Sequence, residues 1–127
     1  MFDMRTSILI NMHNYKELKV WKRAIDFAQL VYQTTNEFPS EEKFGLISQL
    51  RRAAVSVASN IAEGAGRNTK GEFGQFLGIA NGSLCEIETQ IIIAKNLKLI
   101  EKEAFESICE EIDHLQRMLF NLKKTLR

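Results

Sequence analysis

Proline occurs once in this chain of 127 residues, at Pro39, and apolar residues on both sides of it recur at spacings of three and four. This spacing places apolar side chains on one face of an α-helix, whereas a half-buried strand requires strict alternation. Stretches typical of strands are almost absent. The sequence therefore predicts an all-α protein with short connections, folded as an antiparallel up-down-up-down four-helix bundle.

Four helices follow from the periodicity, over about 16–37, about 41–63, from just after Thr69 to about 97, and about 101–126. Pro39 disfavours helical conformation in the residue before it and so ends the first helix. Ser40 is the predicted cap of the second helix, where Glu41 and Glu42 suit the positive end of the helix dipole.

Each predicted helix carries one apolar stripe. The first two stripes are Leu18, Trp21, Ile25, Ala28, Val31 or Tyr32, and Thr35, followed by Phe44, Ile47, Leu50, Ala54, Val57 or Ala58, and Ile61. The last two are Phe73, Phe76, Leu77, Leu84, Ile87 and Ile91, followed by Phe105, Ile108, Ile112, Leu115, Leu119 and Leu122.

The stretch NIAEGAGRNTKGEFGQF, residues 60–76, joins the second and third helices and is rich in glycine. It matches neither the phosphate-binding loop, which requires a glycine before the lysine, nor the dinucleotide-binding pattern, which requires a third glycine at position 69. Gly64 or Gly66 in a left-handed conformation would end a helix, and Thr69 with Glu72 forms a capping box that starts the next one. The alternative is an anion site at that helix start, formed with Arg67 and Lys70.

Four glycines of the third helix lie in one sector, nearly opposite its apolar stripe: Gly71, Gly74, Gly78 and Gly82. Each interior helical glycine costs about 1 kcal/mol relative to alanine. Close approach of another backbone would offset that cost, so these residues are predicted helix-packing positions. A helix with two opposed packing faces also predicts an oligomer. The alternative is a set of exposed glycines that the helix tolerates.

Composition and motifs give no support for an enzyme. Glu111 and His114 match the Glu-x-x-His pattern of di-iron bundles only once, so no metal, cofactor or catalytic residue is predicted. Cys85 and Cys109 show no metal-ligand spacing and are expected to be reduced, which favours the cytoplasm. No apolar segment approaches the roughly 20 residues that span a bilayer, so no membrane association is expected.

The formal net charge of +1, from 17 basic and 16 acidic residues, does not by itself predict nucleic-acid binding. Bases nevertheless cluster on the first helix and at one point of the second, and clustered bases bind phosphate backbones. The alternative is an ordinary solvated surface. Along the fourth helix, acids crowd the start and bases the end, as the helix dipole favours. The candidate nucleic-acid-binding residues are Lys16, Lys19, Lys22, Arg23, Arg51 and Arg52.

Three stretches, YKELKVWKRA (15–24), EFPSEEKFGLISQLRRAAVSVASNIAEG (37–64) and EFGQFLGIANGSLCEIETQI (72–91), resemble the four-helix-bundle proteins encoded by intervening sequences of bacterial 23S rRNA genes. That family is similar to the accessory variability protein of diversity-generating retroelements. The resemblance implies a homopentamer and a role in binding nucleic acid. Met12 lies where related chains tend to begin, so residues 1–11 are predicted to be an upstream extension without structure. The predicted N-terminal extension as a whole covers residues 1–14, and the bundle covers 15–127.

Several polar and small residues match the motif of that family, in addition to Arg51 and Arg52: Ser56, Asn60, Glu63, Gly64, Ser83 and Glu86. Whether Asn60, Glu63 and Glu86 stabilise a polar core or line a site stays open at this point. The family often shows proline where this chain has Ala58, which predicts a straighter second helix.

The sequence thus predicts a non-enzymatic, oligomeric bundle without a cofactor. Its expected partners are copies of itself, with a pentamer favoured, and RNA, DNA or a nucleic-acid-processing protein. The alternative is a structural or protein-interaction module that binds no nucleic acid.

Overall fold

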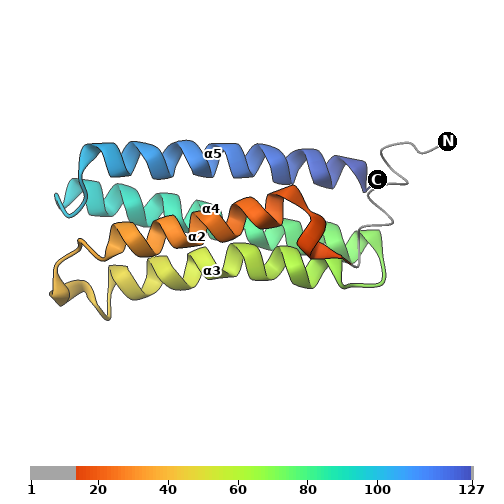
Figure 1. Cartoon of the computed structure of the whole chain (residues 1–127), viewed down its shortest axis with the longest axis horizontal. Helices are drawn as coiled ribbons and strands as arrows, with labels where there is room; N and C mark the ends of the chain where they lie inside the picture. Colours follow the sequence, from red (N-terminus) through yellow and green to blue (C-terminus); the bar gives the residue numbers. More distant parts are fainter. Residues whose placement is uncertain (1–13, 127) are drawn as a thin grey trace.

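The computed structural model describes residues 14–126, which contain four α-helices: α2 (Lys19–Thr35), α3 (Leu46–Ala65), α4 (Lys70–Asn96) and α5 (Lys102–Thr125). Two short 3₁₀ turns, η1 (Tyr15–Glu17) and η2 (Ser40–Glu42), precede α2 and α3. The helices run antiparallel to their neighbours in chain order, so α2 and α4 start where α3 and α5 end (Figure 1). The predicted all-α, up-down-up-down bundle is confirmed. The predicted extension over residues 1–14 lies outside the described part of the chain, except for Asn14.

One apolar core runs the length of the bundle, with Phe27, Leu50, Phe73 and Ile112 among its fully buried side chains. The predicted stripes of the third and fourth helices largely supply it. The predicted face of α2 is correct for Leu18, Val31 and Thr35, which are buried, and rotated for the rest. The other buried residues of α2 are Val20, Ala24 and Phe27, whereas Trp21, Ile25 and Ala28 are half-buried. This helix has apolar residues on two adjacent lines, so spacing alone did not select the core-facing one.

The start of α3 also differs from the prediction. Residues 40–42 form the η2 turn, and α3 begins at Leu46 with Gly45, not Ser40, at its N-cap. The Glu42 carboxylate accepts a hydrogen bond from the Leu46 amide at 3.2 Å, so it satisfies a donor in the first turn. Phe44 therefore lies outside the helix and is 90% exposed, not in the core.

The joint between α3 and α4 is a helix end followed by a capped helix start. The Thr69 hydroxyl accepts a hydrogen bond from the Glu72 amide at 3.1 Å, which is the N-cap bond of the predicted capping box. The Glu72 carboxylate accepts from the Thr69 hydroxyl at 3.0 Å, not from the Thr69 backbone amide as in the full capping box. The prediction of a left-handed glycine is wrong, since Gly66 ends α3 with φ −84° and no described glycine has positive φ. The left-handed residue is Lys98 (φ 61°), just after α4.

The close helix contact falls at a different glycine from those predicted. A Cβ added to Gly64 of α3 would lie 2.7 Å from the Phe76 Cβ and 3.3 Å from the Phe73 carbonyl oxygen of α4. A Cβ on Gly71 or Gly82 would meet nothing within 4 Å, and on Gly74 or Gly78 only the Lys123 side chain. Within residues 14–126 of the subunit, no other backbone approaches these four glycines, so a backbone contact at this series stays a prediction for the assembly. None of the described helices is long and apolar enough to span a membrane.

Candidate nucleic-acid interface

The basic residues predicted on the first helix are exposed, and one of them is paired. Lys16 lies in η1, and Lys19 and Lys22 lie on the first turn of α2. Arg23 makes a two-pronged ion pair with Glu111 of α5, with its Nε 2.5 Å from Oε1 and its Nη2 3.1 Å from Oε2. That hydrogen bond raises the pKa of Arg23, so its charge is held against a carboxylate. The three lysines are the stronger phosphate candidates.

Arg51 has a structural role. Its Nε donates to the Thr35 hydroxyl at 2.9 Å, its Nη2 donates to the Asn36 side-chain oxygen at 2.8 Å, and its guanidinium lies 4.6 Å from the centroid of the Tyr32 ring. These contacts fasten the end of α2 to α3. Arg52 is exposed on the next position. Both arginines lie far along the bundle from the α2 lysines, so the six predicted bases do not form one site.

The fold instead gathers basic residues from segments that are distant in sequence. We define the basic half of the bundle as residues 14–26, 57–83 and 114–126, which share one end because the helices alternate in direction (Figure 1). It carries nine bases and only the acids Glu17, Asp26, Glu63 and Glu72, a formal charge of +5 with His114 neutral. The nine bases are Lys16, Lys19, Lys22, Arg23, Arg67, Lys70, Arg117, Lys123 and Lys124.

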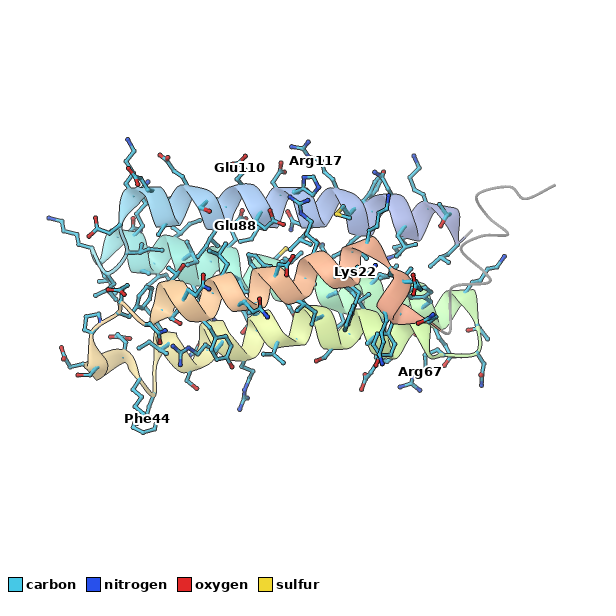
Figure 2. All side chains as sticks on the ribbon, in the orientation of Figure 1. Lys22, Phe44, Arg67, Glu88, Glu110 and Arg117 are labelled. Atoms are coloured by element: carbon cyan, nitrogen blue, oxygen red, sulfur yellow. The ribbon has the colours of Figure 1, made fainter. Side chains whose placement is uncertain are left out.

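The acidic half, residues 27–56 and 84–113, has the opposite charge. It carries eleven acids against six bases, a formal charge of −5. Lys22 and Arg67 lie toward one end of the bundle, and Phe44 marks the other (Figure 2). The described part of the chain is neutral in sum, so its near-zero net charge conceals two oppositely charged halves. Two ion pairs, Arg23–Glu111 and Arg117–Asp113, join the halves across their boundary.

A groove runs between α4 and α5 in the basic half and has a volume of about 380 Å³. We call it the α4/α5 groove, and define it by Leu77, Gly78, Asn81, Gln116, Leu119, Phe120 and Lys123. The Lys123 ammonium lies 3.8 Å from the Cβ position of Gly78. A second depression of about 240 Å³, lined by Lys70, Gly71, Gly74 and Lys123, continues it toward the end of the bundle.

Phe120 stands at the edge of this groove and is 62% exposed. The Lys124 ammonium lies 5.6 Å from the centroid of its ring, which is within cation–π range. Arg117, one turn earlier on α5, pairs with Asp113. An exposed aromatic ring thus lies among three basic side chains of one helix.

The polar residues of the family motif meet between α3 and α4, but not all of them are buried. The Ser56 and Ser83 hydroxyls are 2.9 Å apart, and the Asn60 amide donates to the Ser56 carbonyl at 2.8 Å. Glu63 and Glu86 are exposed, so the core interpretation is wrong for them within the subunit. Glu86 accepts a hydrogen bond from Gln90 at 3.3 Å.

A third surface is apolar and was missed by the sequence analysis. Ile25, Ala28, Tyr32 and Val55 line a groove of about 520 Å³ between α2 and α3, which we call the α2/α3 groove. Further apolar side chains are at least two-fifths exposed on α4, namely Ile79, Ile92 and Ile93. Trp21 and Ile25 had been assigned to the core, so the available signal was a second apolar line on the first helix.

The histidine, cysteine and acidic side chains of the described residues lie apart, and the two cysteines differ in exposure. Within residues 14–126, no three histidine, cysteine, aspartate or glutamate side chains are grouped as metal ligands would be. Cys85 is exposed and Cys109 is half-buried. Desolvation, and secondarily the charge of Glu88, raise the pKa of the Cys109 thiol, so it stays protonated at neutral pH.

Residues 16–121 match the pattern of one protein family, described as 23S rRNA-intervening sequence protein. The chain belongs to this family. The match includes the Lys16–Arg23 segment, the family-motif residues between α3 and α4, and Phe120. It ends just before Lys123 and Lys124.

A crystal structure of a protein with unknown function from the S23 ribosomal protein family of Bacteroides thetaiotaomicron has a similar fold, with a TM-score of 0.75. The two chains are 23% identical, and the similarity covers 83% of this chain and 95% of that one. No curated protein matches this chain. The 23S rRNA-intervening sequence family and the fold are therefore established.

Proposed function

We propose that this member of the 23S rRNA-intervening sequence family is a non-enzymatic, self-assembling bundle that binds nucleic acid through its basic half. The observation that carries the proposal is the separation of charge along the bundle, +5 in one half and −5 in the other. A phosphate backbone is attracted to one end and repelled from the other, although the net charge is close to zero.

The composition of the basic half suits phosphate contacts. Lys16, Lys19 and Lys22 are exposed, and a lysine ammonium is a flexible point charge that contacts a backbone without demanding one geometry. Each neutralised phosphate releases condensed counterions, so affinity should fall steeply with salt. This type of contact supplies affinity and little sequence preference.

The test is binding of fluorescent RNA and DNA, single-stranded and duplex, over a series of salt concentrations. Lys16→Gln with Lys22→Gln removes two charges from the basic half, and Lys43→Gln with Lys102→Gln removes two from the acidic half. We expect the first pair to weaken binding roughly tenfold. For a single strand, the slope of log affinity against log salt concentration should become less steep by about 1.4. The second pair should change little. Equal effects of both pairs, or binding insensitive to salt, would contradict the proposal.

Self-assembly is supported by the α2/α3 groove, because Tyr32 and Val55 are 42% and 45% exposed there, and a second copy seated on the groove would remove their apolar surface from water. The resemblance to the accessory variability protein of diversity-generating retroelements makes a homopentamer the favoured assembly. Light scattering of purified protein tests it, with Val55→Asp as the variant expected to dissociate the assembly. A monomeric wild type would contradict it.

The same groove supports the second candidate function, a structural or protein-interaction module without nucleic-acid binding. The binding series above separates the two. Assembly without salt-dependent nucleic-acid binding would favour the second candidate.

A further inference from the structure

The edge of the α4/α5 groove combines three kinds of side chain. Phe120 supplies an exposed aromatic face, Lys123 and Lys124 supply positive charge, and Asn81 and Gln116 supply amides. A duplex backbone needs only the charges. Aromatic faces and amides are what proteins use to hold unpaired bases.

We propose that the α4/α5 groove binds single-stranded nucleic acid, with an unpaired base stacked on the ring of Phe120. This inference rests on the proposed function and names the form of nucleic acid and the residue that selects it. The Lys123 and Lys124 ammonium groups contact the phosphates on either side of the stacked base.

The exposed ring is the first argument. Phe120 is 62% exposed, and burying it on a base removes apolar surface from water. The Lys124 ammonium lies over the ring, 5.6 Å from its centroid, so a base that stacks on that face displaces the ammonium, which can then contact a flanking phosphate. Arg117 lies one turn earlier on the same side of α5, but its charge is paired with Asp113, so Lys123 and Lys124 are the two phosphate candidates.

The groove beside the ring is the second argument. Gly78 has no side chain to fill the groove, and the Lys123 ammonium lies 3.8 Å from the place where a Cβ of residue 78 would be. The Gln116 amide donates to the Cys85 sulfur at 3.6 Å, and a thiol sulfur is a weak acceptor that a base carbonyl would displace. Amide groups from α4 and α5 are therefore available to base edges next to the ring.

A duplex does not satisfy this arrangement. Its bases are stacked on each other, and their faces are inaccessible to a protein ring unless a base is extruded. The groove should therefore bind a single strand in preference to a duplex of the same length. Stacking on phenylalanine has little base preference, so RNA and DNA strands both qualify.

The chain offers a matched control. Phe44 is 90% exposed and has the Lys43 ammonium 5.5 Å from its ring centroid, so locally it resembles Phe120. It lies in the acidic half, next to Glu41 and Glu42. Phosphate is repelled there, and the same substitution at Phe44 should leave binding unchanged.

The experiment uses the whole protein and short RNA and DNA oligonucleotides, single-stranded and as duplexes, followed by fluorescence anisotropy. Phe120→Leu keeps an apolar side chain and removes the aromatic face. Phe120→Trp is a separate variant that keeps an aromatic face for stacking. We expect Phe120→Leu to lose roughly tenfold in single-strand affinity, from the stacking of one base, and to change duplex affinity less than twofold. Phe120→Trp should bind single strands at least as well as wild type. Phe44→Leu should match wild type.

The possible outcomes are distinguishable. Salt-dependent binding that Phe120→Leu and Phe44→Leu leave equally unchanged would overturn the Phe120 inference and leave the proposed function standing. Equal loss for single strands and duplexes would show that Phe120 supports the fold of the basic half and does not stack on a base, which also overturns the inference. Absence of binding by the wild type to every oligonucleotide overturns both.

Discussion

The two sides of α4 differ in how tightly they are closed. On the side facing α3, Gly64 brings the helices into near contact, and paired polar side chains join them at Ser56–Ser83 and Gln49–Gln90. On the side facing α5, the glycines of α4 meet only the Lys123 side chain, and a groove of about 380 Å³ stays open. The α3–α4 contact is therefore the tighter of the two, and the α4–α5 side has an open groove beside the shared core, to which α5 contributes Ile108, Ile112 and Leu115.

The same contrast separates two groups of glycines in this bundle by the space around them. Gly64 is buried, and its missing Cβ is required by the neighbouring helix. Gly78 and Gly82 are exposed, and their missing Cβ leaves space. An interior glycine lowers helix stability by a similar amount at any of these positions, so Gly64 differs from Gly78 and Gly82 only in the atoms that surround it.

The largest change in the free energy of unfolding is expected for Gly64→Ala, on the closed side of α4. The new Cβ would lie 2.7 Å from the Phe76 Cβ, which cannot move without its backbone. We expect a net loss of about 2 kcal/mol in the free energy of unfolding, after allowing for the better helix propensity of alanine. Urea denaturation measures it. A variant as stable as wild type would show that α3 and α4 can separate at this point.

Ser83→Ala tests the polar contacts of the closed side. Ser83 is 8% exposed, and its hydroxyl lies 2.9 Å from that of Ser56. Its removal should cost about 1 kcal/mol, because Ser56 keeps its contact with Asn60 and is not left unpaired. Thr89→Ala on the exposed outer surface of α4 is the control, with an expected change within about 0.5 kcal/mol. Equal effects would argue against a closed side.

Gly82→Ala should have the opposite sign. Since an added Cβ meets nothing within 4 Å, the gain in helix propensity should stabilise the subunit by up to about 1 kcal/mol. Thermal denaturation at low protein concentration measures this, and light scattering measures the assembly. A less stable assembly together with a more stable subunit would place Gly82 at an interface between copies. Destabilisation of the isolated subunit would contradict the open description of this side.

The smallest effect on stability is expected for Lys123→Gln. The side chain lies across an exposed surface, so unfolding should change by less than about 0.5 kcal/mol. The loss of this charge should nevertheless make the slope of log single-strand affinity against log salt concentration less steep by about 0.7. Lys102→Gln, at the acidic start of the same helix, is the control for both measurements. A large loss of stability in Lys123→Gln would mean that the lysine helps to close the α5 side.

Much of the fold could be predicted from the sequence because it depends on local signals. The capping box at Thr69 and Glu72 placed the start of α4 correctly, and apolar periodicity found every helix. The start of α3 was misplaced because its first turn is capped by Glu42 from within an apparently continuous helical pattern. The rotation of α2 depends on which of two apolar lines the other helices cover, and that choice is not local.

The candidate interface was harder to predict because it is assembled from both ends of several helices. Grouping charges by helix joined Lys22 to Arg51, which the fold separates, and left out Lys70 and Lys124. Grouping them by end of the bundle would have found the basic half from sequence alone, once alternating helix directions were assumed. The role of Arg51 could not be found in this way, because it depends on contacts with Thr35 and Asn36 across the α2–α3 turn.

The separation of charge along the bundle has a consequence for any ring in which the subunits stand side by side and point the same way. Rotational symmetry would then place every +5 half on one rim and every −5 half on the other. Like charges would repel around each rim, and salt would screen that repulsion. Added salt should thus strengthen the ring while it releases the nucleic acid, so the two equilibria would respond to ionic strength in opposite directions.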